Sequence, residues 1–350
     1  MKKSLAVLLV LCLLAAVGMT GCKPKPIGKL YLYNWTEYIP QDVFDLFEEE
    51  TGIRVVESTY SSNEQMLAKL DIDKDYDYDV LVPSSYVIET LKEKDLIQPI
   101  NTANIPNFAN VDPSVLNRDF DPGNQYSVPY MATMTVIAVN REKIANLGVE
   151  IQSLNDLLDP RLEGQIVCLD DSRELVDAAL KATIAEPDYT SKEQIESTLP
   201  WLLELKKNVA AFDSDSPYSL IASNEVAVGL VYNIDAGQAI GENDAIDVVY
   251  TTEPCELAID NFVITKNAKN VEYAEKFIDF IHRPEVYKMI LDEFPGVCLN
   301  NAALAILGPE YLDNAGSNVD KDELARAHLT SDVGDAGQYY DEIFNKMKAD

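Results

Sequence analysis

Short apolar runs alternate along this chain with longer segments in which apolar residues recur every three to four positions. The run at 29–33 predicts a strand, and the segment after it, with Val43, Phe44 and Phe47 on one face, predicts a helix that ends at Gly52. The alternation continues to the end of the chain and indicates a parallel α/β sheet. Further strands are predicted at 53–56, 80–82, 135–139, 226–232 and 262–264, and further helices after 62 and at 235–240, 271–281, 284–294 and 339–347.

The N-terminal segment has the features of an export signal. A positive start precedes an uncharged apolar run at 5–17, shorter than the roughly 18 residues that a membrane-spanning helix needs. Residues 19–22 read MTGC and resemble the site that lipoprotein signal peptidase cuts before a cysteine. We therefore predict a signal peptide at 1–21, a lipid on Cys22 and a polar tether at 22–27. An ordinary secretory signal with an incidental cysteine is the alternative.

The length of the remaining chain indicates two lobes. About 330 residues exceed what one hydrophobic core usually serves. We place the first lobe at 28–138 and 260–303, and the second at 139–259 and 304–350. Because the chain passes between the lobes more than once, crossing segments of extended chain would form a hinge.

Acidic side chains far outnumber basic ones. The chain has 59 Asp and Glu against 28 Lys and Arg, a formal net charge of −31 at pH 7. Such a field repels nucleic acid, which excludes that partner, and attracts cations, which favours a cationic ligand. Solubility is the alternative explanation, because most of these acids must be solvated surface.

The sequence carries no recognisable catalytic or cofactor-binding motif. His282 and His328 are the only histidines, too few and too far apart for a histidine metal cluster. Ser84 and Ser85 lack the G-x-S-x-G context of a hydrolase nucleophile, and no glycine-rich loop could cradle a phosphate. The acidic run at 71–79 lacks the glycine and the final glutamate of a calcium loop. We therefore expect no enzyme, no cofactor and no metal.

The cysteines do not predict a disulfide framework. Cys12 leaves with the signal peptide and Cys22 carries the lipid, so Cys168, Cys255 and Cys298 remain. An odd number cannot all pair, and three dispersed cysteines in a chain of this size do not make a disulfide scaffold. One bridge among the three stays open at this point.

Ligand-binding residues are expected where strands end, because ligands bind outside the carboxyl ends of strands in an open parallel sheet. This rule selects loops at 35–38, at 84–86, after Leu169, at 232–235 and at Asp260. The loops are rich in aromatic rings and acids. Carboxylates accept hydrogen bonds from ammonium groups, and rings offer flat walls for methylenes and attract cations. The predicted loops therefore suit a protonated amine.

Several motifs resemble those of the periplasmic spermidine/putrescine-binding proteins. They are YNWTEYIP at 33–40, VPSSY at 82–86, DDSRE at 170–174, NVAAF at 208–212 and SDVG at 331–334. The resemblance is collinear over essentially the whole mature chain. It implies the two-lobed type II periplasmic binding protein fold, with a mixed, mostly parallel sheet flanked by helices in each lobe and the ligand in the cleft between them.

The resemblance also implies a set of ligand-binding positions. Some are aromatic walls, some are hydroxyl contacts, and five are acids that would hold the amines. They are Trp35, Thr36, Glu37, Tyr38, Ser84, Ser85, Tyr86, Asp171, Glu174, Tyr232, Asp235 and Asp260. Two of the acids, Asp171 and Glu174, also lie at a predicted helix start, where the helix dipole favours acids whatever the ligand.

The chain departs from the family at positions of the second half of the aromatic box. Ala258 stands where a large ring is expected, Gly296 lies near another aromatic position, and Thr330 stands where glutamine is typical. Tyr232 replaces the usual tryptophan, whereas Asp235 matches an acid of the putrescine-preferring branch. These departures favour putrescine at least as much as spermidine.

The resemblance implies a receptor in the periplasm that captures putrescine or spermidine and delivers it to an ABC transporter permease. A lipid on Cys22 would be its only attachment to a membrane, and a monomer is expected. Three alternatives stay open: a receptor for another cationic amine, an envelope sensor that signals on closure, and, with no catalytic group to support it, an amine-modifying enzyme.

Overall fold

The computed structural model describes residues 26–73 and 76–349. The predicted signal peptide at 1–21, the lipid site Cys22 and the first part of the tether lie outside the described residues. Within residues 26–73 and 76–349, no helix is long and apolar enough to cross a membrane.

Two groups of strands share two long central strands. In the first group β1 pairs in parallel with β2 and β3, and β10 is antiparallel to β3, β4 and β5. In the second group β6 pairs in parallel with β7 and β8, while β5 is antiparallel to β8 and β9. The strands are β1 (Gly28–Trp35), β2 (Ile53–Tyr60), β3 (Val80–Leu81), β4 (Ile97–Gln98), β5 (Ser127–Asn140), β6 (Ile166–Cys168), β7 (Val209–Phe212), β8 (Val228–Tyr232), β9 (Ile246–Val249), β10 (Glu256–Thr265), β11 (Val297–Cys298) and β12 (His328–Leu329).

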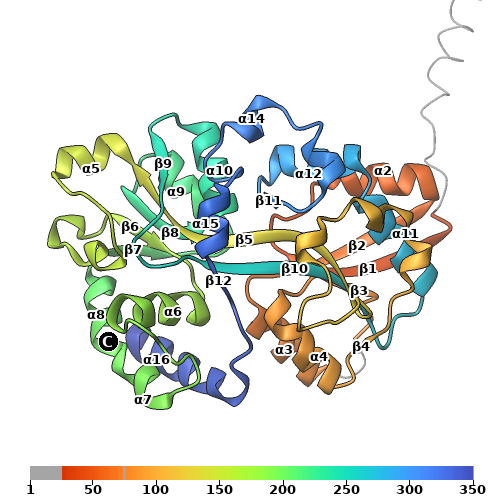
Figure 1. Cartoon of the computed structure of the whole chain (residues 1–350), viewed down its shortest axis with the longest axis horizontal. Helices are drawn as coiled ribbons and strands as arrows, with labels where there is room; N and C mark the ends of the chain where they lie inside the picture. Colours follow the sequence, from red (N-terminus) through yellow and green to blue (C-terminus); the bar gives the residue numbers. More distant parts are fainter. Residues whose placement is uncertain (1–25, 74–75, 350) are drawn as a thin grey trace, which may run out of the picture.

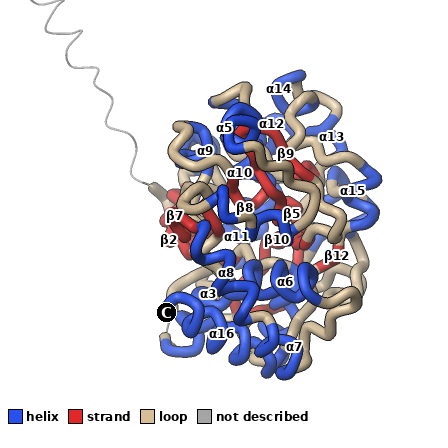
Figure 2. The backbone as a smooth tube through the Cα atoms, turned by 90° about the vertical axis from the view of Figure 1, so that its left-hand side faces the viewer, coloured by secondary structure: helices blue, strands red, loops and turns tan. Residues whose placement is uncertain are grey.

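Helices cover both faces of the strands (Figure 2). Beside the first group lie α2 (Gln41–Thr51), α3 (Asn63–Ile72), α4 (Ile88–Glu93), α11 (Val271–Ile281), α12 (Pro284–Glu293), α13 (Asn301–Leu304) and α14 (Pro309–Leu312). Beside the second lie α5 (Arg141–Leu147), α6 (Ser172–Thr183), α7 (Lys192–Ser197), α8 (Leu199–Asn208), α9 (Tyr218–Ala222), α10 (Asn233–Glu242) and α16 (Gly337–Ala349), with α15 (Lys321–Arg326) between them. A short 3-10 turn, η1 (Ser85–Val87), follows β3.

The strands β5 and β10 run between the two halves of the molecule (Figure 1). They pair with each other from Leu257 opposite Met134 to Val263 opposite Ser127. The sequence pattern predicted only a part of each, 135–139 and 262–264. Pro129 in β5 and the buried Asp260 in β10 interrupt the apolar pattern, although both lie inside the strands.

Local signals set several element ends as predicted. Helix α2 ends before Gly52, whose φ of 72° is the left-handed conformation that glycine adopts without strain. Helix α3 begins after Ser62, whose hydroxyl accepts a hydrogen bond from the Gln65 amide. The helix predicted at 271–281 has those bounds in the structure, because its apolar face packs against the first group of strands.

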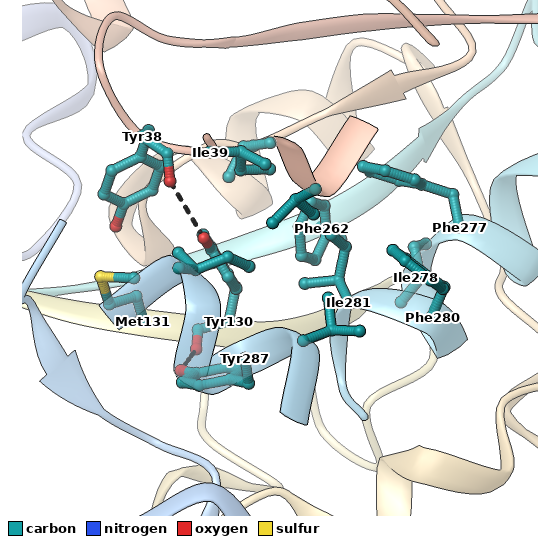
Figure 3. Packing of buried hydrophobic residues seen from close by; sticks show 14 of the residues in the cluster. Tyr38, Ile39, Tyr130, Met131, Phe262, Phe277, Ile278, Phe280, Ile281 and Tyr287 are labelled. Carbon is teal, nitrogen blue, oxygen red and sulfur yellow. Dashed lines mark hydrogen bonds between the residues drawn. The ribbon is translucent and has the colours of Figure 1, made fainter. Parts of the chain in front are cut away.

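Aromatic rings join the loop after β1 to the hydrophobic core of the first group of strands (Figure 3). The hydroxyl of Tyr130, on β5, donates to the backbone oxygen of Tyr38 at 3.1 Å, and the two rings meet edge to face. The hydroxyl of Tyr287, on α12, donates in turn to the backbone oxygen of Tyr130. Because these rings are fully buried, the loop that carries Tyr38 is fixed to the core.

The three described cysteines, Cys168, Cys255 and Cys298, are free thiols. Burial raises the pKa of each thiol above its ordinary value. Thiols with raised pKa values are poor nucleophiles, so these side chains act as small apolar core residues.

Candidate functional site

A cavity of about 670 Å³, partly open to solvent, lies between the two groups of strands. Its walls come from loops at the carboxyl ends of β1, β2, β3, β7 and β8, and from the middle of β5 and β10. A concave site lined by aromatic rings and a few polar groups is typical of small-molecule binding. The lining residues are Trp35, Thr36, Glu37, Tyr38, Tyr60, Ser61, Asn63, Ser84, Tyr86, Thr133, Glu174, Ser214, Asp215, Tyr232, Ile234, Asp235, Gln238, Ala258 and Asp260.

The loop after β1 supplies one wall. The indole nitrogen of Trp35 donates to the Val82 backbone oxygen at 2.8 Å, which fixes the ring plane. Glu37 has a φ of 51°, a left-handed conformation that is rare for a residue with a side chain. Strained backbone of this kind is held by the surrounding structure and is common at binding sites. The turn thereby directs both the ring and the carboxylate at the cavity.

Asp260 is anchored on the crossing strand β10. Only 2% of its surface is exposed, and a register irregularity follows it in the pairing with β5. The Tyr38 hydroxyl donates to one carboxylate oxygen at 2.5 Å, and the Ser84 hydroxyl donates to the other at 2.6 Å. Charge-assisted hydrogen bonds hold the carboxylate in one orientation toward the cavity.

Asn63 organises the polar contacts of the same wall. Its side-chain amide donates to the Ser84 hydroxyl at 3.1 Å and to the Tyr86 hydroxyl at 2.8 Å. Its amide oxygen accepts from the Ser84 backbone N–H at 3.2 Å. One buried side chain therefore positions two of the predicted contact residues.

The second group of strands supplies Glu174, Tyr232 and Asp235. Glu174 lies in the first turn of α6 and accepts a hydrogen bond from the Thr135 hydroxyl at 2.5 Å. Tyr232 ends β8, and Asp235 lies in the first turn of α10 directly after it. These positions follow the rule that ligand contacts gather at the carboxyl ends of strands.

The cavity concentrates acids that lack a basic partner. Burial raises the pKa of Asp260 to about 6 and, with help from Asp171, the pKa of Glu174 to about 8. Burial also raises the pKa of Asp235 well above its usual value, with Asp213 and Glu37 adding to the rise. Among the described residues that line the cavity, none is Lys, Arg or His. A cation bound in the cavity would offset the desolvation that disfavours the charged form of these carboxylates.

The acids fall into two groups. Burial raises the pKa of Glu37, and repulsion from Asp215 and Asp213 raises it further. Glu37 in turn adds to the raised pKa of Asp235. Glu37 and Asp235 therefore belong to one group of acids in the cavity. Asp260 and Glu174 both add to the raised pKa of Tyr232, a ring of the same cavity. Several carboxylates from both groups of strands suit a ligand that carries more than one positive charge.

Ten of the twelve residues predicted from the resemblance line the cavity, and Ser85 and Asp171 do not. The Ser85 hydroxyl accepts from the Ile259 backbone N–H at 3.4 Å. Asp171 caps α6 by accepting from the backbone N–H groups of Arg173 and Glu174, the helix-start role that was the alternative for it.

Two of the three departures in the aromatic box lie away from the cavity lining. Ala258 lines the cavity, whereas Gly296 and Thr330 do not. A Cβ added at Gly296 would collide with the Met131 side chain, so a ring there would require Met131 to move. The Thr330 hydroxyl donates to the buried Glu256 carboxylate at 2.9 Å. Of these three positions, only Ala258 changes the cavity wall directly; Tyr232 in place of tryptophan is a further change in the lining.

Sequence reasoning missed several lining residues at strand ends. Tyr60 ends β2 and is followed by Ser61 and Asn63, while Ser214 and Asp215 follow β7. The rule that selected the other loops would have found both segments had the ends of these two strands been predicted. Among the described residues, no group of three or more His, Cys, Asp or Glu is arranged to hold a metal ion.

Comparison with known proteins confirms the resemblance. The chain is 38% identical over 334 residues to the spermidine/putrescine-binding periplasmic protein of Escherichia coli, with 95% of each chain covered. It is 30% identical over 332 residues to the putrescine/cadaverine-binding protein of Pseudomonas aeruginosa, covering 92% of this chain and 94% of that one.

A solved structure confirms the two-lobed fold. The Tp0655 lipoprotein of Treponema pallidum matches with a TM-score of 0.79 and 29% identity, covering 91% of this chain and 99% of that one. A family model described as bacterial extracellular solute-binding protein matches residues 42–305. The chain therefore belongs to the bacterial extracellular solute-binding protein family.

Proposed function

We propose that this protein is a periplasmic receptor that closes on a linear polyamine, putrescine or spermidine, and delivers it to an ABC transporter permease. One observation carries the proposal: an interlobe cavity with aromatic walls, several acids and no basic lining residue in the described chain. The names of the relatives support the same ligand class. A solute-binding family also favours a receptor over an enzyme.

The chemistry of a diamine accounts for both kinds of lining residue. Its buried methylenes contribute about 0.8 kcal/mol each, so the four of putrescine give roughly 3 kcal/mol. Micromolar to nanomolar binding needs about 8 to 12 kcal/mol. Charge-assisted hydrogen bonds of about 1.5 to 3 kcal/mol each must supply much of the rest, against the entropic cost of association. A site with several acids meets this requirement and a single acid would not.

Calorimetry with a panel of diamines, triamines, amino acids and metal ions tests the proposal. We expect saturable one-to-one binding of putrescine and spermidine, and weaker or no binding of amino acids and metal ions. Binding of an unrelated solute class, or turnover of a bound amine, would overturn it. Membrane vesicles carrying the permease would then distinguish a transport receptor from an envelope sensor, because only the former raises amine uptake.

The attachment to the membrane is a separate part of the proposal. A lipid on Cys22, with cleavage after residue 21, would hold a monomeric receptor at the membrane by its tether. Mass spectrometry of the mature N-terminus tests this, and Cys22→Ser should release the protein from the membrane fraction. An unmodified N-terminus at another residue would contradict it.

We also propose that closure bends the crossing strands. The first lobe would comprise 28–138 and 260–303, and the second 139–259 and 304–350. Leu307 and Tyr311 pack in the first core, so we move the final crossing to the residues after Tyr311. Small-angle scattering with and without ligand would detect the closing motion.

Selectivity gives a further prediction. Asp235→Asn should weaken putrescine binding about three- to tenfold and spermidine binding less, because a diamine has one fewer ammonium to compensate for the lost charge. Calorimetric titration of both amines checks this, with the exposed Asp119→Asn as the matched control. Equal losses for both amines, or a clear wild-type preference for spermidine, would contradict the assignment.

A further inference from the structure

Arg173 connects the two halves of the molecule from a buried position. It lies in the first turn of α6 with 3% of its surface exposed, and it pairs with Asp177 on the same helix at 3.1 Å. Its guanidinium carbon lies 4.9 Å from the ring centroid of Tyr340 and 5.2 Å from that of Tyr86. Tyr340 belongs to α16 beside α6, whereas Tyr86 belongs to η1 beside the first group of strands. The guanidinium is thus held between rings from both sides of the cleft.

The ring of Tyr86 has two roles in this arrangement. It lines the ligand cavity, and its hydroxyl is held by the Asn63 side chain at 2.8 Å. The neighbouring Glu64 carboxyl, 3.5 Å from the same hydroxyl, has a buried oxygen with no hydrogen-bond partner. Burial and the charge of Asp171 raise the pKa of Glu64, and the positive charge of Arg173 opposes this rise. Arg173 therefore interacts with two side chains on the opposite side of the cleft.

Two hydrogen bonds between loops on opposite sides of the cleft lie at the surface. The Ser61 hydroxyl donates to the Asp215 carboxylate at 2.8 Å, and the Thr90 hydroxyl donates to Asp332 at 2.7 Å. Exposed hydrogen bonds exchange readily with water and contribute little net stability. A desolvated cation–π contact contributes more, and it is lost entirely when the rings separate. Among these contacts, the Arg173 stack is the buried one.

We propose that Arg173 is a positioning residue that clamps Tyr86 against the ligand in the closed state and so sets the residence time of the bound amine. The proposal rests on the proposed function, which it deepens. When the lobes separate, the guanidinium keeps Asp177 and Tyr340 but loses Tyr86, so opening carries an additional cost. The clamp therefore lowers the dissociation rate of the ligand and does not change its association rate.

Arg173→Lys tests the clamp while keeping the charge beside Asp177, because lysine can pair with a carboxylate but cannot stack as a flat guanidinium does. We expect this variant to release putrescine about three- to thirtyfold faster in stopped-flow measurements of Trp35 fluorescence, with little change in the association rate. Tyr86→Phe removes the hydroxyl but keeps the ring, so it serves as the matched control. In a Tyr86→Phe background, Arg173→Lys should speed putrescine release as much as it does in the wild type.

A double-mutant cycle separates the clamp from a structural role within the second lobe. In a Tyr86→Leu background the stack is already absent, so Arg173→Lys should no longer speed release. An equal effect of Arg173→Lys with and without the ring, or no effect in the wild type, would overturn the proposal.

Calorimetry on the wild type tests polyamine binding separately. If no polyamine binds, the distance between spin labels on the two lobes of the free protein tests the clamp: Arg173→Lys should widen it, and unchanged distances would overturn the clamp.

Discussion

Replacing Asp260 with alanine is expected to weaken polyamine binding by about 2 to 5 kcal/mol, the range found when one partner of a buried charge pair is removed. The carboxylate is almost fully buried and is held in one orientation by Tyr38 and Ser84, so its contact with an ammonium group would be desolvated. The loss should affect putrescine and spermidine alike, because each would lose a buried counter-charge for one ammonium group in a closed cleft.

Calorimetric titration of both amines into Asp260→Ala and the wild type measures this loss. The exposed Asp119→Asn controls for the change in net charge, and circular dichroism confirms that the variant folds. Tyr38→Phe and Ser84→Ala should each have a smaller effect, since the carboxylate remains. Binding of either amine within threefold of the wild type would show that Asp260 does not hold an ammonium.

The stability of the free protein should fall as the pH rises from about 6.5 to about 8.5, by about 1 to 2 kcal/mol in the free energy of unfolding. Burial raises the pKa of Glu174 to about 8 from an ordinary value of 4.5, so the native state holds a proton that the unfolded chain has released. The stability from this proton is complete below pH 4.5 and is lost as the pH rises through about 8. Saturating putrescine should reduce the fall, because an ammonium group replaces the proton.

Urea unfolding across this pH range, with and without putrescine, checks the expectation. His328, whose pKa is raised by its hydrogen bond to Glu256, contributes with the same sign. Glu174→Gln and His328→Gln therefore separate the two contributions. Glu174→Gln should reduce the fall in the free energy of unfolding with pH more than His328→Gln does. A free energy of unfolding that stays constant or rises over the range would contradict this account.

The elements that sequence reasoning recovered well are those whose own residues determine them. The helix at α11 has a continuous apolar face, and α2 ends where glycine adopts a left-handed conformation. The central strands were recovered only in part. In β10, Asp260 is buried because hydroxyls from distant loops satisfy it, and no local pattern records such partners. Tertiary contacts therefore decide the length of the crossing strands.

The candidate site shows the same division. Acids and rings that follow predicted strands were found, whereas Asn63 was missed because its role depends on Ser84 and Tyr86 from another loop. Asp171 follows a strand and was predicted to bind the ligand; in the structure one of its carboxylate oxygens caps α6 and the residue does not line the cavity, so its contact with the ligand stays a prediction. Whether a carboxylate at a helix start reaches a neighbouring cavity depends on how the helix packs, which the sequence does not show.

The position of β10 bears on how the newly made chain acquires its structure. β1, β2 and β3 come from the first 81 residues, but the strand that completes their sheet spans 256–265, and the helices α11 and α12 that cover it come later still. A nascent chain that has emerged only to residue 250 lacks this strand, and its first group of strands keeps an unpaired edge at β3. We therefore expect this half of the molecule to complete its core only after residue 265 has been made, whereas β6, β7 and β8 of the other half have been made by residue 232.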